Sequence, residues 1–256
     1  MLALLRWRQL EYRGIVIGVA LLAAIFAIGS ALVPGYGAWN NVRSILVLAA
    51  FLGIASLGQT LVALVGGLDL SIPFVIGSAN ILLAFLLAAG LPTALAIILI
   101  ALGGALVGAI NGQLGYRIQG QSLIVTLGVG FALVGASQIV TTWGSQYSGS
   151  VFTQAPAWFS ALASVNGQTF GLPIPPIALI WAVIALIAVV TLRRARRGRE
   201  IYAVGDNRTA AARLSISEYR IWMAVHIVSG LAASLTGMLL LGFSGGGFSA
   251  SAIPIC

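Results

Sequence analysis

The chain alternates long apolar runs with short polar or glycine- and proline-containing breaks. Seven of these runs approach the roughly 20 residues that a helix needs to cross the hydrocarbon core of a bilayer. Pro34-Gly35 ends the first run, and 66–71 separates the second from the third. The pattern predicts an all-α, polytopic bundle of about seven membrane-spanning helices. The expected spans are 14–33, 45–65, 73–89, 92–115, 123–142, 176–192 and 219–242.

The arginines indicate the orientation of these spans. Basic residues concentrate in cytoplasmic loops. If the N-terminus is cytoplasmic, twelve of the thirteen arginines lie in or directly beside the cytoplasmic segments, and only Arg43 lies outside. We therefore expect a cytoplasmic N-terminus. The third and fourth spans are joined by a very short turn, which predicts an antiparallel hairpin.

The segment 143–175 is nearly uncharged and rich in Ser, Gln, Pro and aromatic residues. Trp143, Tyr147, Trp158 and Phe159 suit a membrane interface, where aromatic rings gather. Part of this segment is expected to form a short interfacial helix.

Composition narrows the function. The chain is 60% hydrophobic and 7% charged, so its main solvent is lipid. It has no lysine, which excludes a P-loop lysine and a Schiff base, and we expect no enzymatic activity in this chain. One cysteine, Cys256, excludes an internal disulfide framework, and one histidine, His226, excludes a multi-histidine metal site. The net charge of +8 comes from arginines at the ends of apolar runs and does not indicate nucleic-acid binding.

Gly242-Phe243-Ser244-Gly245-Gly246 matches the G-x-S-x-G pattern of serine hydrolases. No acid follows Ser244, and His226 lies 18 residues before it, about 27 Å along one helix. Catalysis by this serine is therefore rejected. His226 is interpreted as an interhelical hydrogen-bonding group.

Small residues recur every four positions on two spans. Gly104, Gly108 and Gly112 lie on the fourth, and Gly128, Ala132 and Ala136 on the fifth. Such ridges let helix backbones approach closely in lipid. Ordinary packing is the preferred interpretation, and a surface that slides during gating is the alternative.

Asp69 is the acid closest to the interior of a membrane segment. An ionisable residue there is a functional candidate by default. Asp69 and Ser71 also precede Pro73 as helix N-caps do, and Gly66-Gly67 supplies a break. Capping and helix breaking are preferred, with a direct role in the pathway or gating as the alternative.

The stretch 193–220 holds eight of the thirteen arginines. The arginines at 193–199 are explained by the preference of basic residues for cytoplasmic loops. That preference does not explain the Gly205-Asp206-Asn207 break or the Ala-rich helix predicted at 209–214. The segment 193–218 is therefore predicted to be a cytoplasmic coupling loop. Gly205 would turn the backbone with positive φ, and Asp206 or Asn207 would cap the helix.

These residues also carry a family resemblance. The sequence GREIYAVGDNRTAAARLSIS (198–217) resembles the cytoplasmic G-R-x-I-Y-A-x-G-x-N-x-x-A-A-R-L-S-G-I motif of monosaccharide ABC-importer permeases of the ribose, xylose, arabinose and galactose type. GGLDLSI (66–72), ALVGAINGQLGYRI (105–118) and SLIVTLGVGFALVGASQIV (122–140) resemble further segments of that family in the same order. Together the four matches cover nearly the whole chain.

The resemblance implies a permease subunit in the bacterial inner membrane. Its implied partners are a cytoplasmic ATPase, a periplasmic sugar-binding protein, a second permease copy and membrane lipid. It implies no cofactor on this chain, with ATP and Mg on the ATPase. It places ATPase coupling on Tyr202, Gly205, Asp206, Asn207, Ala211, Ala212, Arg213 and Leu214, and a signature helix break on Gly66, Gly67, Asp69 and Ser71.

Two departures qualify the resemblance. Ser217 stands where the motif has Gly, unless a residue is missing after Ser215. The family has about ten spans, so 1–256 is expected to be one permease domain that lacks its C-terminal spans. The alternatives are a permease for branched-chain amino acids or another small solute, and a truncated membrane protein that does not transport.

Overall fold

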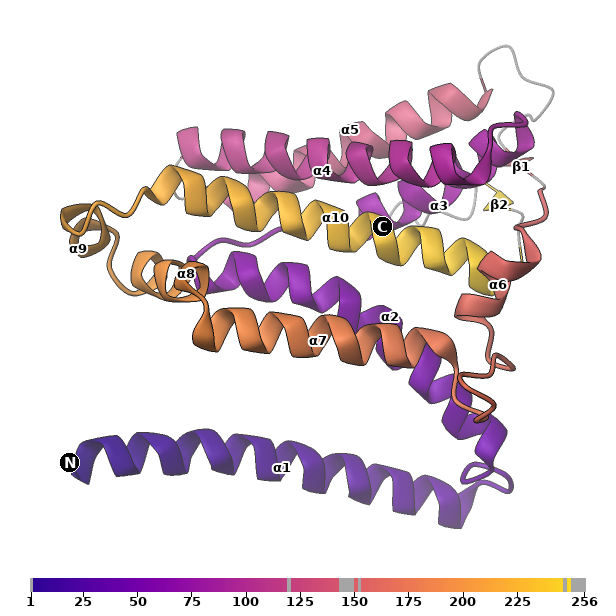
Figure 1. Ribbon diagram of the computed structural model, residues 1–256, viewed down its shortest axis with the longest axis horizontal. Helices are drawn as coiled ribbons and strands as arrows, with labels where there is room; N and C mark the ends of the chain where they lie inside the picture. The colour runs from indigo at the N-terminus through magenta and orange to yellow at the C-terminus, as the bar shows by residue number, and fades with distance from the viewer. Residues whose placement is uncertain (1, 119–120, 143–149, 152, 246–247, 250–256) are drawn as a thin grey trace. The chain divides into compact units, whose positions relative to one another are not determined.

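A computed structural model describes the chain except residues 1, 119–120, 143–149, 152, 246–247 and 250–256 (Figure 1). Cys256 and the aromatic positions Trp143 and Tyr147 lie outside the described residues. The chain divides into two compact units, 1–46 and 47–256.

The first unit consists of a long helix and the turn that follows it. Helix α1 (Leu2–Leu32) ends before Gly35, whose φ of 81° reverses the chain toward α2 (Trp39–Leu64). The Tyr36 ring lies directly over Gly29, where a β-carbon would come within 2.7 Å of it. Asn41 Nδ2 donates to the Tyr36 carbonyl at 2.6 Å, which ties the turn to the start of α2.

The second unit holds the rest of α2 and the remaining elements. Strands β1 (Ser150–Val151) and β2 (Phe248–Ser249) form a two-residue antiparallel pair in which Ser150 faces Ser249. All other named elements are helices: α3 (Ile72–Ala88), α4 (Thr93–Arg117), α5 (Ser122–Thr142), α6 (Ala157–Ala163), α7 (Pro176–Arg194), α8 (Arg196–Asp206), α9 (Arg208–Arg213) and α10 (Glu218–Ser244).

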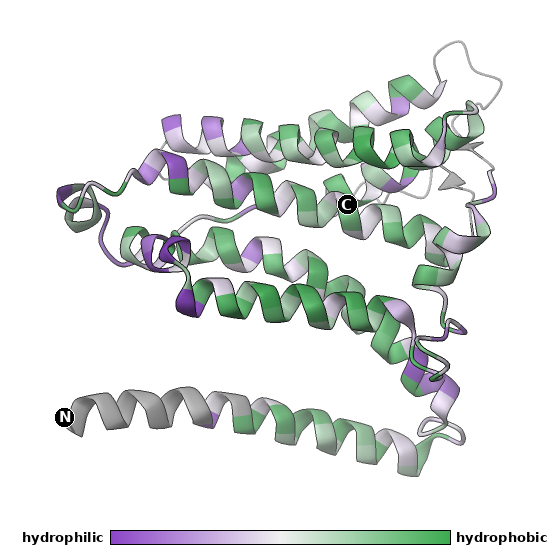
Figure 2. Ribbon diagram, viewed as in Figure 1, coloured by the Kyte–Doolittle hydropathy of each residue, from purple (hydrophilic) through white to green (hydrophobic). Residues whose placement is uncertain are grey.

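The helices follow the predicted spans closely. Among the described residues, α2, α4, α5, α7 and α10 are long and apolar enough to cross a membrane. Two shorter apolar stretches, Val16–Leu32 within α1 and Ile72–Ala88 (α3), occupy the first and third predicted spans. Figure 2 shows apolar residues along these helices and hydrophilic residues gathered on α8 and α9. The predicted all-α membrane bundle is confirmed, while seven crossings and a cytoplasmic N-terminus stay predictions.

Helix α10 is the centre of the second unit. It packs against α4, α3 and α6 (Figure 1). More than half of its residues are buried. Its Leu241 and Met238 pack with Leu83 of α3 and Ile100 of α4. Its other faces join α2, α6 and α7 in one cluster and the α8–α9 segment in another. A displacement of α10 would therefore change the packing of most helices in this unit.

The connections between the membrane helices agree in part with those predicted from the sequence. Helices α3 and α4 pack together across a short turn in which Gly90 has a φ of 82°, which confirms the hairpin. Helix α6 is the predicted short helix of the 143–175 segment. Trp158 is exposed, but Phe159 is buried against Gly242 of α10 and is a core residue, not an interfacial one.

Candidate functional site

The predicted coupling loop consists of two helices that meet at Asn207. This residue is extended, with a φ of −154°, and its side-chain oxygen accepts a hydrogen bond from the Ala210 backbone N–H at 3.0 Å. Asparagine satisfies free N–H groups at a helix start in this way. The short Ala-rich helix is therefore present as α9, and Asn207, not Asp206, caps it.

Gly205 has a different role from the predicted one. It lies inside α8 without positive φ, so it does not turn the backbone. A β-carbon at Gly205 would collide with the carbonyl oxygen of Leu64, at the end of α2. Gly205 is needed because the backbones of α8 and α2 touch there.

Arg208 attaches α9 to the membrane helices. Its guanidinium forms a 3.0 Å ion pair with Glu218, the first residue of α10, and donates to the Val65 carbonyl at 3.3 Å. It also lies 5.2 Å from the centre of the Trp222 ring. These contacts commit the Arg208 guanidinium to the chain's own α2 and α10 and not to a partner protein.

The other contacts divide α9 into an inner and an outer face. Ala211 is buried with Val204 among residues of α2 and α10, so its side chain is not on the outer surface predicted for coupling. Tyr202 is 48% exposed and Leu214 is 72% exposed. We call five of the exposed residues the outer face: Tyr202, Asp206, Ala212, Arg213 and Leu214.

The end of α9 uses an unusual backbone geometry. Ser215 has a φ of 58°, and the Ile216 N–H donates to the Ala211 carbonyl at 3.1 Å, a pattern that closes many helices. Ser217, which departs from the resembled motif, is the N-cap of α10 and accepts from the Arg220 N–H at 3.4 Å. Only 214–217 separates α9 from α10, so the outer face is directly connected to the central helix.

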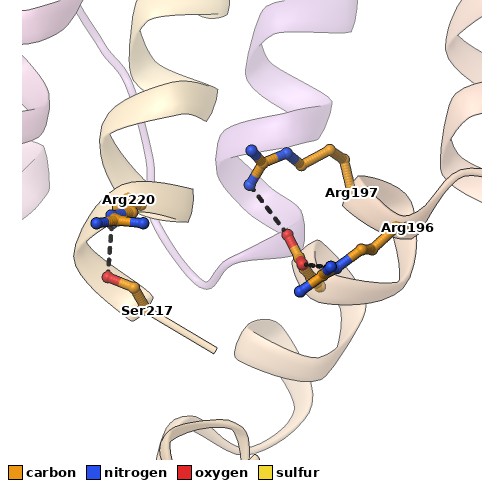
Figure 3. Close-up of polar contacts among 5 residues, drawn as sticks. Arg196, Arg197, Ser217 and Arg220 are labelled. Carbon is orange, nitrogen blue, oxygen red and sulfur yellow. Dashed lines mark hydrogen bonds and ion pairs between the residues drawn. The ribbon is translucent and has the colours of Figure 1, made fainter. Parts of the chain in front are cut away.

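Helix α8 carries a small charge cluster. Glu200 accepts from Arg196 Nε at 2.8 Å and from Arg197 Nη1 at 3.1 Å (Figure 3). The hydrogen bond from Arg196 lowers the pKa of the Glu200 carboxyl, and the positive charge of Arg197 acts in the same direction.

The helix break at 66–71 is the second part of the site. Gly66 has a φ of 81°, and Asp69 in the break is only 3% exposed. Asp69 Oδ1 accepts from the Ser71 N–H at 3.0 Å and from the Ser71 hydroxyl at 2.6 Å. Asp69 Oδ2 accepts from the Ser229 hydroxyl of α10 at 2.8 Å.

Polar groups of three further helices complete this network. Asn111 Nδ2 of α4 donates to Ser71 Oγ at 2.7 Å. The backbone N–H groups of the break bond to Gln59 of α2 at 3.2 Å and to Thr126 of α5 at 2.9 Å. Asp69 therefore does more than the predicted capping: its loop joins α2, α4, α5 and α10. Ser71 is the N-cap residue of α3, but its side chain makes no capping hydrogen bond.

Asn111 and Ser229 are two further residues of this network that were not predicted as site residues. Both are completely buried polar residues in apolar helices. Polar side chains inside spans are rare and tend to face partners in the bundle. That signal would have identified them as candidates, although not their pairing with the break.

The glycine ridges have different environments on the two helices. A β-carbon at Gly108 would collide with the His226 carbonyl of α10, and one at Gly104 would collide with Ser234. Gly112 faces Met223, with a β-carbon 3.0 Å from its sulfur. Gly128 is exposed, and no atom of the described residues lies within 4 Å of its β-carbon position, so it makes no packing contact within the described part of this chain. Its neighbour Gly130 packs instead, against Phe74 of α3.

His226 is buried on α10, on the same helix as Ser244. Its Nδ1 lies 2.9 Å from the Trp222 carbonyl, one turn earlier, and its ring lies against the Trp222 ring. The interhelical hydrogen bond expected for His226 is thus an intrahelical one. No group of three or more acidic, histidine or cysteine residues that could hold a metal is found in the described part of the chain.

Comparison with known proteins agrees with this arrangement. Residues 41–253 match the family described as the permease component of the branched-chain amino acid transport system. The chain is 31% identical over 245 residues to the probable ABC transporter permease protein YphD of Escherichia coli K12, covering 96% of this chain and 70% of YphD. No solved structure matches the chain significantly.

A second relative is named for its transport system. The autoinducer 2 import system permease protein LsrD is 29% identical over 194 residues, both in Escherichia coli K12 and in Shigella flexneri. The match covers 76% of this chain and 58% of LsrD, so the chain spans less than two thirds of that relative. With its apolar helices, the chain is a multi-pass protein of the bacterial inner membrane. It belongs to the permease-component family of ABC transport systems.

Proposed function

We propose that the chain is the membrane subunit of an ATP-driven importer for a monosaccharide, coupled to a cytoplasmic ATPase through the outer face. The observation that carries this proposal is the exposure of Tyr202 and Leu214 on a segment anchored firmly to the membrane helices. Large side chains with apolar surface that are exposed on a rigid, otherwise polar segment are typical of a docking surface.

The contacts suggest how movement would pass into the bundle. Force on α9 reaches α10 through the 214–217 connection and through the Arg208–Glu218 ion pair. It reaches α2 through the backbone contact at Gly205. Helix α10 passes it on to the break through the Ser229–Asp69 hydrogen bond. The chain performs no covalent chemistry here, and ATP with Mg acts on the partner.

The substrate proposal rests on the GGLDLSI break and the 198–217 motif, which resemble sugar permeases. A branched-chain amino acid is the second candidate, favoured by the description of the matching family. The autoinducer named in the LsrD relatives is the third. A periplasmic binding protein and a second permease copy complete the proposed complex.

Co-purification of a co-expressed cytoplasmic ATPase subunit of the ABC-importer type tests the coupling. Ala212→Trp places an indole on the outer face, and Ala132→Trp places one on the exposed surface of α5 as the control. We expect Ala212→Trp to reduce ATPase recovery at least about tenfold, equivalent to about 1.4 kcal/mol. The control should retain it. Equal recovery with both variants would remove the outer face as the docking surface.

Reconstituted complexes tested with labelled solutes decide the substrate. We expect ATP-dependent uptake of one of ribose, xylose, arabinose or galactose, and none of leucine. Uptake of leucine alone would replace the sugar proposal with the amino-acid one. An absence of uptake despite normal ATPase binding would favour a subunit that does not transport.

A further inference from the structure

An apolar groove of about 580 Å³ opens between α2, α7 and α10 in the second unit. Leu57 of α2, Ile187 of α7 and Val228 of α10 are among the residues that line it. Along α7 the groove extends from Ile184 to Leu192, about 12 Å at 1.5 Å per residue. This is less than half of the roughly 30 Å hydrocarbon core, so the groove is short enough to fit within one leaflet.

Positive charge gathers at one end of this groove. Arg197 of α8 and Arg220 of α10 line the same cavity as the apolar residues. The side chain of Arg197 is 73% exposed, although one of its nitrogens contacts Glu200. Arg197 and Arg220 are the charged residues that line the groove, and they give its lining a charge of +2, while Glu200 contacts Arg197 from outside the lining. For Arg220, no ion pair is found among the residues that the structure describes.

We propose that this groove binds an anionic phospholipid, with the phosphate between Arg197 and Arg220 and an acyl chain along α7. Basic pockets between membrane helices suit anionic headgroups. A soluble anion would match the arginines but leave the apolar length of the groove without a partner. A zwitterionic lipid would fill the groove but bring no net charge to match +2. This inference does not depend on the proposed transport function.

Native mass spectrometry of the full chain in detergent micelles tests the proposal. Purified protein is titrated with phosphatidylglycerol and, separately, with phosphatidylethanolamine. At about 1 kcal/mol for each arginine, the Arg197→Gln/Arg220→Gln double variant should bind phosphatidylglycerol about 30-fold more weakly. Each single variant should lose about fivefold. Binding of phosphatidylethanolamine should change little.

Two controls separate the headgroup from the groove. Arg199→Gln removes a charge from the same helix at a residue that does not line the groove, so it should bind phosphatidylglycerol as the parent does. Ala224→Trp places an indole in the groove from an exposed position on α10 and should weaken binding of both lipids. Gel filtration establishes that each variant is folded.

Three outcomes would overturn the proposal. Equal affinity of the parent for the two lipids would mean that the arginines select no headgroup. An effect of Arg199→Gln as large as that of Arg197→Gln would indicate general surface attraction. Unchanged lipid binding by folded Ala224→Trp would show that the groove holds no acyl chain and is covered by something else, such as another helix.

Discussion

Replacing Asp69 tests whether the helix break depends on its hydrogen bonds or on its charge. Asp69 accepts three well-formed hydrogen bonds, two from Ser71 and one from Ser229. Leucine has a similar size but accepts none of them, so Asp69→Leu leaves three buried donors without their acceptor. Each buried group left unsatisfied costs about 1–3 kcal/mol. The hydroxyl groups can partly recover by bonding to helix carbonyls, so we expect a loss of about 3–5 kcal/mol.

Asparagine should be tolerated far better. Its Oδ1 can keep both bonds from Ser71, and the hydroxyl of Ser229 can reverse and accept from the new amide. Only the additional strength of bonds to a charged acceptor is lost, about 1 kcal/mol. Transport by a complex that contains this variant should therefore survive, and transport by Asp69→Leu should not.

The assay is unfolding of the purified chain in detergent micelles by added dodecyl sulfate, followed by circular dichroism. Ser229→Ala is the matched partner variant, because it removes the donor that contacts Oδ2. Combined with Asp69→Leu it should lower stability by less than the two separate losses together, since the shared bond is counted once. If Asp69→Asn destabilises the chain as much as Asp69→Leu, the charge itself is required and the hydrogen-bond argument is refuted.

Three further predictions follow from the backbone contacts and the helix arrangement. Gly108→Ala should lower stability by about 1–3 kcal/mol in the same unfolding assay, because its β-carbon meets α10, while Gly128→Ala should leave it unchanged or slightly raised. Ser215→Gly should raise stability by about 0.5–1 kcal/mol by relieving the left-handed conformation, and a decrease would contradict this. For topology, with Cys256 replaced by serine, a cysteine replacing the exposed Leu172 should react with an impermeant maleimide from outside intact cells, and one replacing Leu214 only after lysis; labelling of Leu214 in intact cells would refute the orientation.

The membrane helices could be predicted from the sequence because the lipid environment imposes strict requirements on each short stretch of consecutive residues. A spanning segment must satisfy its backbone internally and must be apolar over about 20 residues. Both requirements are visible in consecutive residues, so the predicted start of the sixth span at Pro176 coincides with the start of α7. The break at 66–71 and the short helix after Asn207 were visible for the same reason, since glycine, proline and capping residues act locally.

The faces of these helices were decided only by the tertiary structure. In water, a polar face shows which side of a helix is buried, but in lipid both sides are apolar and that signal disappears. Gly128 and Gly130 illustrate this, because nothing in their sequence neighbourhood indicates that the second, and not the first, meets Phe74. The close approach of Gly205 to Leu64 likewise joins residues 141 positions apart.

The contact partners of the charged residues could not be predicted from the sequence either. Asp69 was recognisable as a buried acid, but its bond to Ser229 spans 160 positions and exists only because α10 packs beside the break. Arg208 resembled its neighbours in an arginine-rich loop, yet α9 turns it toward Glu218 and Trp222. The local pattern therefore determined which segments enter the membrane and where they break, because lipid and backbone chemistry act on neighbouring residues. Packing between distant segments decided which side chains hold those segments together and which remain exposed for a partner.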